Sequence, residues 1–292
     1  MKITKFLLAA LAVIGLTSCL DSDGNEQTRT DNLVQVFNLV EDTQSGKTQV
    51  VNGVSYTMEF NFTKQTINFA INGLQLSPTS PAYTLSAMNV KYEFNTKGEV
   101  LFTIPNMNNG VCTITNLKFR YRERSTGLQF IPVYDITYTV NGTYNVRAVQ
   151  TSTFFFGETK TSIIGTEDLF TTDKTYYCVV FEPTSVKDGK VLTRLFMYNA
   201  KFAPKMPAMN LMLMELYSEM TKDGFTVDAP MAKVYTGSPQ NPKEEPDYIV
   251  TNFTMEGDYA NSVKFDYTAA GRFKSSAECG LDFTPGLLES LN

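Results

Sequence analysis

The chain has 292 residues and a formal net charge of −5, and it contains neither histidine nor tryptophan. The lack of histidine excludes Ser-His-Asp and Cys-His catalytic groups, as well as zinc, iron or copper sites with histidine ligands. The acidic balance gives no general footprint for binding nucleic acid. Phenylalanine and tyrosine are plentiful, with 21 and 15 residues, and their densest clusters fall in segments that we expect to be buried strands.

The first segment, residues 1–19, has the features of a secretion signal. Lys2 and Lys5 give it a positive start, and the apolar stretch at 6–15 is too short to span a bilayer. The segment ends in Leu-Thr-Ser-Cys, which resembles the lipobox of bacterial lipoproteins. This resemblance implies that Cys19 is acylated and tethers the mature protein to a membrane. The alternative is an ordinary signal peptide that happens to end near a cysteine.

The next segment, residues 20–32, is polar and turn-forming and has no apolar periodicity, so we expect a flexible tether. Asp21, Asp23 and Glu26 follow closely behind Cys19. They resemble the acidic export signal of surface lipoproteins in some Gram-negative anaerobes. The resemblance implies an outer-membrane lipoprotein that is exposed at the cell surface and has the membrane as a partner.

The rest of the chain contains an internal sequence repeat. Residues 75–98 and 201–224 align without a gap and share seven of 24 positions. In the first copy the shared residues are Pro78, Pro81, Ala82, Leu85, Met88, Glu93 and Gly98. Three further blocks match in the same order, so we predict a duplicated module of roughly 120 residues. The predicted modules are residues 33–148 and residues 149–292.

Both modules are predicted to be all-β. Apolar and polar residues alternate in Met88–Phe94, which indicates a strand with one buried face. Gly98 and Gly224 are typical of hairpin turns with glycine at the positive-φ position. Pro78 and Pro204 cannot donate to a ladder and are therefore placed between strands. We expect two tandem homologous antiparallel meanders, each a small barrel or sandwich of about six to eight strands.

A basic stripe is expected in the first module. Arg120, Arg122 and Arg124 take alternate positions on one predicted strand, so their side chains share a face. In the aligned strand of the second module, Glu256 and Asp258 take the places of Arg120 and Arg122. The hypothesis is that the stripe meets an anionic partner such as an acidic glycan, or the acidic surface of the other module. The alternative is ordinary solvated charge.

The sequence predicts a non-catalytic binding or accessory protein, with glycan as the ligand class that its location suggests. Glycines are scattered in turns and form neither a P-loop nor a dinucleotide-binding motif, so no cofactor or metal is expected. One alternative is a lipocalin-like barrel that carries a small apolar ligand. Another is a hydrolase that uses two carboxylates. An aromatic-lined groove would favour the glycan-binding protein. A dry interior cavity would favour the carrier of an apolar ligand, and two convergent buried carboxylates would favour the hydrolase.

Three cysteines remain once Cys19 is lipidated. They are Cys112, Cys178 and Cys279, and their odd number leaves the question of a disulfide open. Cys178 lies in a segment that resembles a buried strand, where it would act as a small hydrophobic residue.

Overall fold

The computed structural model describes residues 26–125 and 130–282, and only the backbone of residues 123–125, 130 and 131. The chain divides into two compact units, Met1–Thr151 (unit 1) and Ser152–Asn292 (unit 2). The sequence placed this division after Ala148. The predicted lipidation site Cys19 lies outside the described residues.

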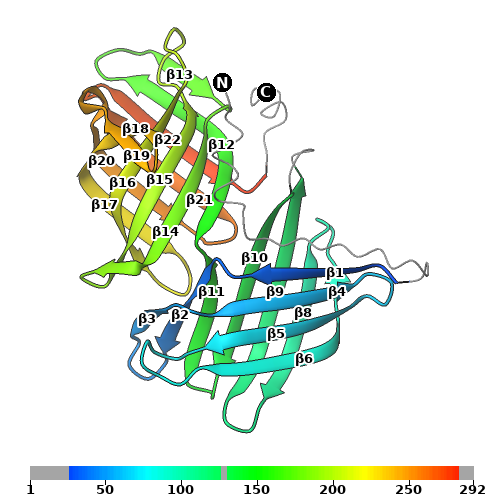
Figure 1. Cartoon of the computed structure of the whole chain (residues 1–292). Helices are drawn as coiled ribbons and strands as arrows, with labels where there is room; N and C mark the ends of the chain where they lie inside the picture. Colours follow the sequence, from blue (N-terminus) through cyan, green and yellow to red (C-terminus); the bar gives the residue numbers. More distant parts are fainter. Residues whose placement is uncertain (1–25, 126–129, 283–292) are drawn as a thin grey trace. The chain divides into compact units, whose positions relative to one another are not determined.

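Antiparallel strands make up both units (Figure 1), which confirms the all-β prediction. The helical structure among the described residues is one turn of 3-10 helix, η1 (Pro246–Tyr248). In the same part of the chain, no helix is long and apolar enough to cross a bilayer.

The strands of unit 1 form a four-stranded sheet and a seven-stranded sheet. The four-stranded sheet has the order β1-β4-β5-β6, and the seven-stranded sheet has the order β3-β2-β11-β10-β9-β8-β7. The bounds are β1 (Thr28–Leu33), β2 (Val36–Asp42), β3 (Thr48–Val51), β4 (Ser55–Asn61), β5 (Thr66–Leu74), β6 (Tyr83–Lys91), β7 (Glu93–Phe94), β8 (Val100–Asn108), β9 (Thr113–Ser125), β10 (Phe130–Val140) and β11 (Tyr144–Gln150).

Between the two sheets lies an aromatic core. Phe69 on β5 meets Phe102 on β8 with ring centroids 5.6 Å apart, and Phe102 stacks on Phe119 at 4.3 Å. Only two residues separate β1 from β2, and Tyr92 alone separates β6 from β7. The chain passes from one sheet to the other at these two places and again between β3 and β4, and both sheets share one core.

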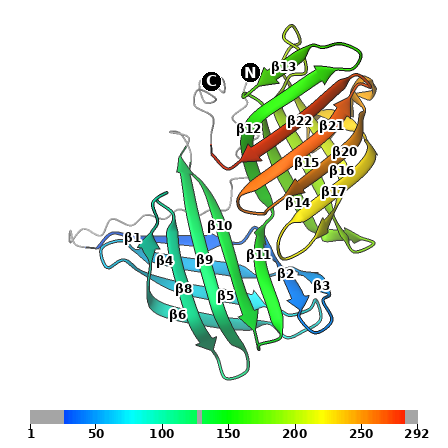
Figure 2. The same cartoon turned by 180° about the vertical axis from the view of Figure 1, so that it is seen from behind.

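In unit 2, eight strands close into a barrel (Figures 1 and 2). The ring runs β12-β14-β15-β16-β17-β20-β21-β22, and β22 pairs with β12. The bounds are β12 (Ser152–Ile163), β13 (Leu169–Thr172), β14 (Tyr176–Lys187), β15 (Lys190–Ala200), β16 (Met209–Met220), β17 (Phe225–Ala232), β18 (Val234–Ser238), β19 (Asn241–Glu244), β20 (Val250–Gly257), β21 (Ser262–Ala269) and β22 (Phe273–Gly280).

Large aromatic side chains are buried in the core of unit 2. Tyr177 and Phe265 stack with ring centroids 4.3 Å apart, and both are fully buried. Among the polar groups buried there, the hydroxyls of Thr193 and Ser218 lie 2.7 Å apart and share a hydrogen bond. A buried hydroxyl without a partner would be costly, so this pairing lets polar side chains sit inside the unit.

Several backbone features recur at the same spacing in the two units. Pro78 lies in the loop between β5 and β6, and Pro204 lies in the loop between β15 and β16, so both prolines are between strands as predicted. Gly73 and Asn199, which are 126 residues apart like the prolines, have φ values of 71° and 53°. Each lies where the register shifts in its ladder. These matches agree with a duplicated module, which stays a prediction.

The predicted tether is too long at its end. Thr28–Leu33, at the end of the predicted 20–32 segment, forms β1 and pairs with β4 along its whole length. Its two charged side chains pair with each other inside the unit: Arg29 Nη2 lies 2.8 Å from Asp31 Oδ2, and Asp31 is 1% exposed. A buried ion pair leaves no hydrophobic pattern in the sequence, so the sequence of this strand resembles that of a polar linker.

The prediction that one face of Met88–Phe94 is buried is also wrong in part. Tyr92 is buried, but Met88 is 63% exposed and Phe94 is 54% exposed. Asn89 has a φ of 55°, and the ladder with β5 shifts register beside it. A bulge adds a residue to one strand, so the alternation changes phase at this point.

Candidate binding groove

A groove of about 770 Å³ lies on the surface of unit 1 over β7, β8, β9 and β10. Residues that are cross-strand partners form two rows along it. The first row is Glu93, Leu101, Arg120 and Asp135. The second row is Thr103, Lys118 and Thr137. Lys91, at the end of β6, completes the charged lining.

The aromatic residues beside the groove belong to its floor. Tyr92, Phe102 and Phe119 are 6%, 4% and 2% exposed, and they pack into the core of unit 1. The lining residues therefore present no exposed ring on which a sugar could stack. A ligand would have to be held there by charges and hydrogen bonds.

Two arginines of the predicted basic stripe are joined to carboxylates. Arg120 Nη2 lies 3.1 Å from Asp135 Oδ2, and Arg120 Nη1 lies 3.9 Å from Glu99 Oε1. Arg122 Nε lies 3.7 Å from the same Glu99 oxygen. Asp135 Oδ1 in turn lies 3.0 Å from Arg147 Nη2. The two stripe arginines do share a face, but they belong to a network of alternating charges.

Arg124, the third member of the stripe, lies on β9 opposite Ile131. Its side chain is outside the described part of the structure. Whether the stripe binds a partner stays a prediction. The alternation of Arg120 and Arg122 was visible in the sequence, but Glu99 and Asp135 were missed because their contacts depend on the pairing of β8, β9 and β10.

The lysines of the groove differ from its arginine in their exposure and in their ion pairing. Lys91 and Lys118 are both exposed. Within the described residues, neither has a carboxylate within ion-pair distance, whereas Arg120 has two. No sequence motif marked these lysines, since each is a single charge on an ordinary strand. Their common position appears only when β6 and β9 are brought to the same surface.

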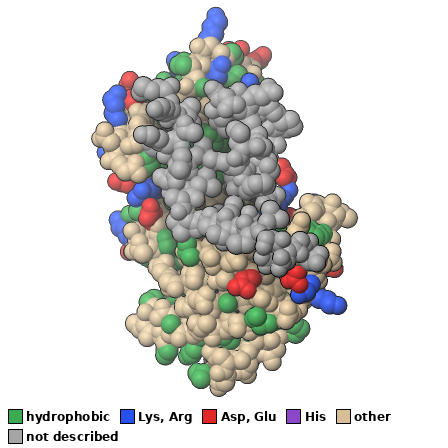
Figure 3. All heavy atoms as spheres, turned by 45° about the vertical axis from the view of Figure 1, so that its right-hand side comes forward, with side chains coloured by type: hydrophobic (Ala, Val, Ile, Leu, Met, Phe, Trp, Pro, Cys, Tyr) green, Lys and Arg blue, Asp and Glu red, His purple; other side chains and the backbone are tan. Residues whose placement is uncertain are grey.

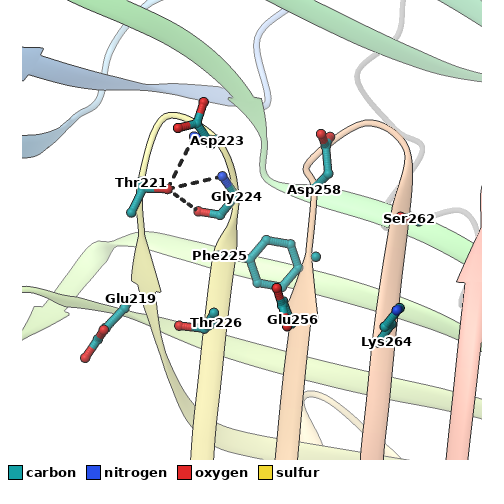
Figure 4. A pocket seen from close by; sticks show the side chains of 11 residues that line it. Glu219, Thr221, Asp223, Gly224, Phe225, Thr226, Glu256, Asp258, Ser262 and Lys264 are labelled. Atoms are coloured by element: carbon teal, nitrogen blue, oxygen red, sulfur yellow. Dashed lines mark hydrogen bonds between the residues drawn. The ribbon is translucent and has the colours of Figure 1, made fainter.

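A second groove, of about 440 Å³, lies over β16, β17, β20 and β21 of unit 2. Figure 4 shows Asp223 and Asp258 on two neighbouring turns, with Glu256 on the adjoining strand. Glu256 is the cross-strand partner of Lys264. Under the predicted duplication, this pair would correspond to Arg120 with Asp135 of unit 1, with the two signs exchanged.

The charges are mixed elsewhere on the surface as well. On the face drawn in Figure 3, acidic and basic side chains lie interspersed among neutral ones. Across the described residues, no three aspartate, glutamate, cysteine or histidine side chains are grouped so that they could hold a metal ion.

Among the described residues, two carboxylates are buried, Asp31 and Glu99. Asp31 accepts from Arg29 and from the hydroxyl of Tyr134, at 2.8 Å and 3.0 Å. Burial, followed by the charge of Asp31, raises the pKa of Tyr134 well above its ordinary value, so this phenol stays protonated as a donor. Asn95 Nδ2 donates to Glu99 at 2.6 Å. Each buried carboxylate is thus held by cationic and neutral partners.

Cys112, Cys178 and Cys279 are free thiols and are buried. Burial raises the pKa of Cys178 and of Cys279 to about 12. Because the thiolate is the reactive form, these two side chains are inert at neutral pH and act as small hydrophobic residues.

In comparisons with protein-family models, curated proteins and solved structures, nothing matches this chain.

Proposed function

We propose that this protein is a lipid-anchored surface lipoprotein that binds an anionic ligand, an acidic glycan, without catalysing a reaction. The groove over β7–β10 supports the binding part of the proposal. Three cations, Lys91, Lys118 and Arg120, line it together with two acids, Glu93 and Asp135. The surplus is positive although the chain as a whole carries a charge of −5, so the groove is a local attractor for anions.

The dimensions of the groove suit a chain of sugars. It extends over four neighbouring strands, and three strand spacings of about 4.8 Å amount to about 14 Å. Thr103 and Thr137 can donate or accept hydrogen bonds, which suits the hydroxyls of a glycan. Because the lining has no exposed ring, the charged side chains would attract the glycan, and hydrogen bonds between the threonines and its hydroxyls would orient it.

The proposed anchor is tested separately from the groove. Metabolic labelling with a fatty-acid analogue should mark the wild-type chain, and Cys19→Ala should abolish the label because the acylated thiol is gone. Protease treatment of intact cells should then degrade the wild-type protein if it is exposed at the surface. Equal labelling of the two chains would reject the lipoprotein assignment.

The binding proposal is tested with a panel of glycans. Full-length protein in mild detergent should bind immobilised acidic polysaccharides such as polygalacturonate and hyaluronan, and should not bind neutral dextran. Binding should weaken as salt is added, because exposed charges are screened. Equal binding of neutral and acidic chains, or no binding to any of them, would contradict the proposal.

Neither alternative is favoured by an observation in the described residues. A carrier of apolar ligands needs an interior cavity, whereas Tyr177 and Phe265 stack inside unit 2 and are fully buried. A carboxylate-dependent hydrolase needs two carboxylates facing one substrate bond. The buried carboxylates of Asp31 and Glu99 instead face arginines.

A further inference from the structure

We infer that Lys91 and Lys118 recognise the acidic groups of the ligand, that Arg120 positions the site, and that the ligand is a sparsely charged glycan. In such a glycan, acidic sugars alternate with neutral ones. The inference rests on the proposed binding role of the groove and specifies which of its residues act and on what.

Arg120 is held by the protein itself. Asp135 Oδ2 lies 3.1 Å from one of its terminal nitrogens, and its side chain is only 27% exposed. A guanidinium that already donates to a carboxylate offers less of its charge to an outside anion. Arg122 lies within ion-pair distance of Glu99, with 3.7 Å between Nε and Oε1, and its side chain is 22% exposed. The arginines therefore fix the shape and charge of the sheet surface.

The two lysines are available to a ligand. Both are exposed, and within the described part of the chain neither ammonium has a carboxylate within ion-pair distance. Lys118 stands between its cross-strand partners Thr103 and Thr137. An acidic sugar at this point could place its carboxylate on the ammonium and its hydroxyls on the two threonines. Lysine acts as a compact point charge with freely turning donors, so it does not require a bidentate partner.

Glu93, an acid of the lining, limits the charge density of the ligand. Glu93 and Asp135 stand at the two ends of the first row, with Leu101 and Arg120 between them. A densely sulfated chain would bring an anionic group against the Glu93 carboxylate, and like charges repel. Asp135 adds little to this repulsion, because Arg120 and Arg147 already compensate its charge. A chain with spaced acidic groups can meet the lysines and leave a neutral hydroxyl at Glu93, to which that hydroxyl can donate.

The test compares three glycans, three single variants and one double variant of the full chain in detergent. Hyaluronan oligosaccharides provide alternating uronate and neutral sugars, dextran sulfate provides dense charge, and dextran provides none. The single variants are Lys91→Gln, Lys118→Gln and the matched control Lys47→Gln. The double variant combines Lys91→Gln with Lys118→Gln. Lys47 is an exposed lysine in the turn between β2 and β3, outside the groove lining. Circular dichroism verifies the fold of each variant.

Hyaluronan should bind more tightly than dextran sulfate. Each groove variant should weaken hyaluronan binding about two- to fivefold, as expected for the loss of one exposed ion pair. Lys91→Gln combined with Lys118→Gln should weaken it roughly tenfold and reduce its salt dependence, and Lys47→Gln should not change it.

The outcomes separate the two levels of the proposal. If the double variant binds hyaluronan as the wild type does, the lysines are not the recognition residues, although the groove can still bind. Tighter binding of dextran sulfate would overturn the sparse-charge ligand. Failure of the wild type to bind any acidic glycan would overturn the proposed function itself.

Discussion

The ion pair between Arg29 and Asp31 allows a quantitative test of how β1 is held in unit 1. Asp31 is 1% exposed, and its Oδ2 lies 2.8 Å from Arg29 Nη2. Arg29 also donates to the Tyr121 hydroxyl at 2.6 Å, and its guanidinium lies 5.3 Å from the centre of the Phe60 ring. Arg29→Met keeps an unbranched apolar stem among these rings but removes the charge that compensates Asp31.

The expected loss of stability is large. Breaking a buried ion pair by removing one partner costs about 3–5 kcal/mol, because the remaining charge is buried without compensation. Combining Arg29→Met with Asp31→Asn removes that charge as well, so the double variant should lose only about 1–2 kcal/mol. Adding Asp31→Asn should thus restore part of the stability that the protein loses through Arg29→Met.

Urea unfolding followed by far-ultraviolet circular dichroism measures both variants. With a slope of about 2 kcal/mol per molar urea, Arg29→Met should lower the midpoint of the affected transition by about 2 M. The double variant should recover more than half of that shift. Equal midpoints for the single and double variants would show that the uncompensated charge of Asp31 is not what destabilises the strand.

Three further predictions concern packing and titration. The pKa of Cys178 is raised from 9.0 to about 12 and that of Tyr267 from 10.0 to about 12, in both cases chiefly by burial. The unfolded chain therefore releases these protons first. The contribution of Cys178 to the free energy of unfolding should be constant below about pH 9 and that of Tyr267 below about pH 10, and each should then fall by about 1.4 kcal/mol per pH unit towards pH 12. A urea midpoint that stays flat between pH 9 and pH 12 would contradict this. Gly73→Ala should cost about 2 kcal/mol more than Gly46→Ala in urea unfolding, since both have positive φ but only at Gly73 does an added Cβ come 2.4 Å from a backbone oxygen; equal costs would refute this. A thiol reagent should modify Cys178 and Cys279 only after denaturation, and rapid labelling of the native protein would contradict their burial.

Local patterns predicted the class of fold because they act over a few residues. The paired prolines lie between strands as expected, and Gly98 has the predicted positive φ, at 74°. Gly224 shows where the same reasoning stops. Its φ is not positive, and glycine is needed there because a Cβ would lie 2.5 Å from the carbonyl oxygen of Gly257. That contact joins two hairpins that are distant in sequence, so turn chemistry could not reveal it.

The candidate site was predicted only in part for a similar reason. The spacing of Arg120 and Arg122 gave their common face, but the register of β8 and β10 decides which carboxylates they meet. The same register brings Lys118 beside Thr103 and Thr137. Register in turn depends on bulges such as the one at Asn116, where φ is 54°. A single residue of slip would reverse every face, so the groove could not be assembled from the sequence alone.

Hydrogen exchange in the presence of a hyaluronan oligosaccharide tests the central claim, that the ligand lies over β7–β10, most directly. Mass spectrometry of the full chain should show slower exchange in peptides that cover Val100–Asn108 and Thr113–Ser125 when the oligosaccharide is bound. Peptides from β12 and β22 should exchange at the same rate with and without it. Protection confined to unit 2, or no change in β8 and β9 at saturating ligand, would contradict the account.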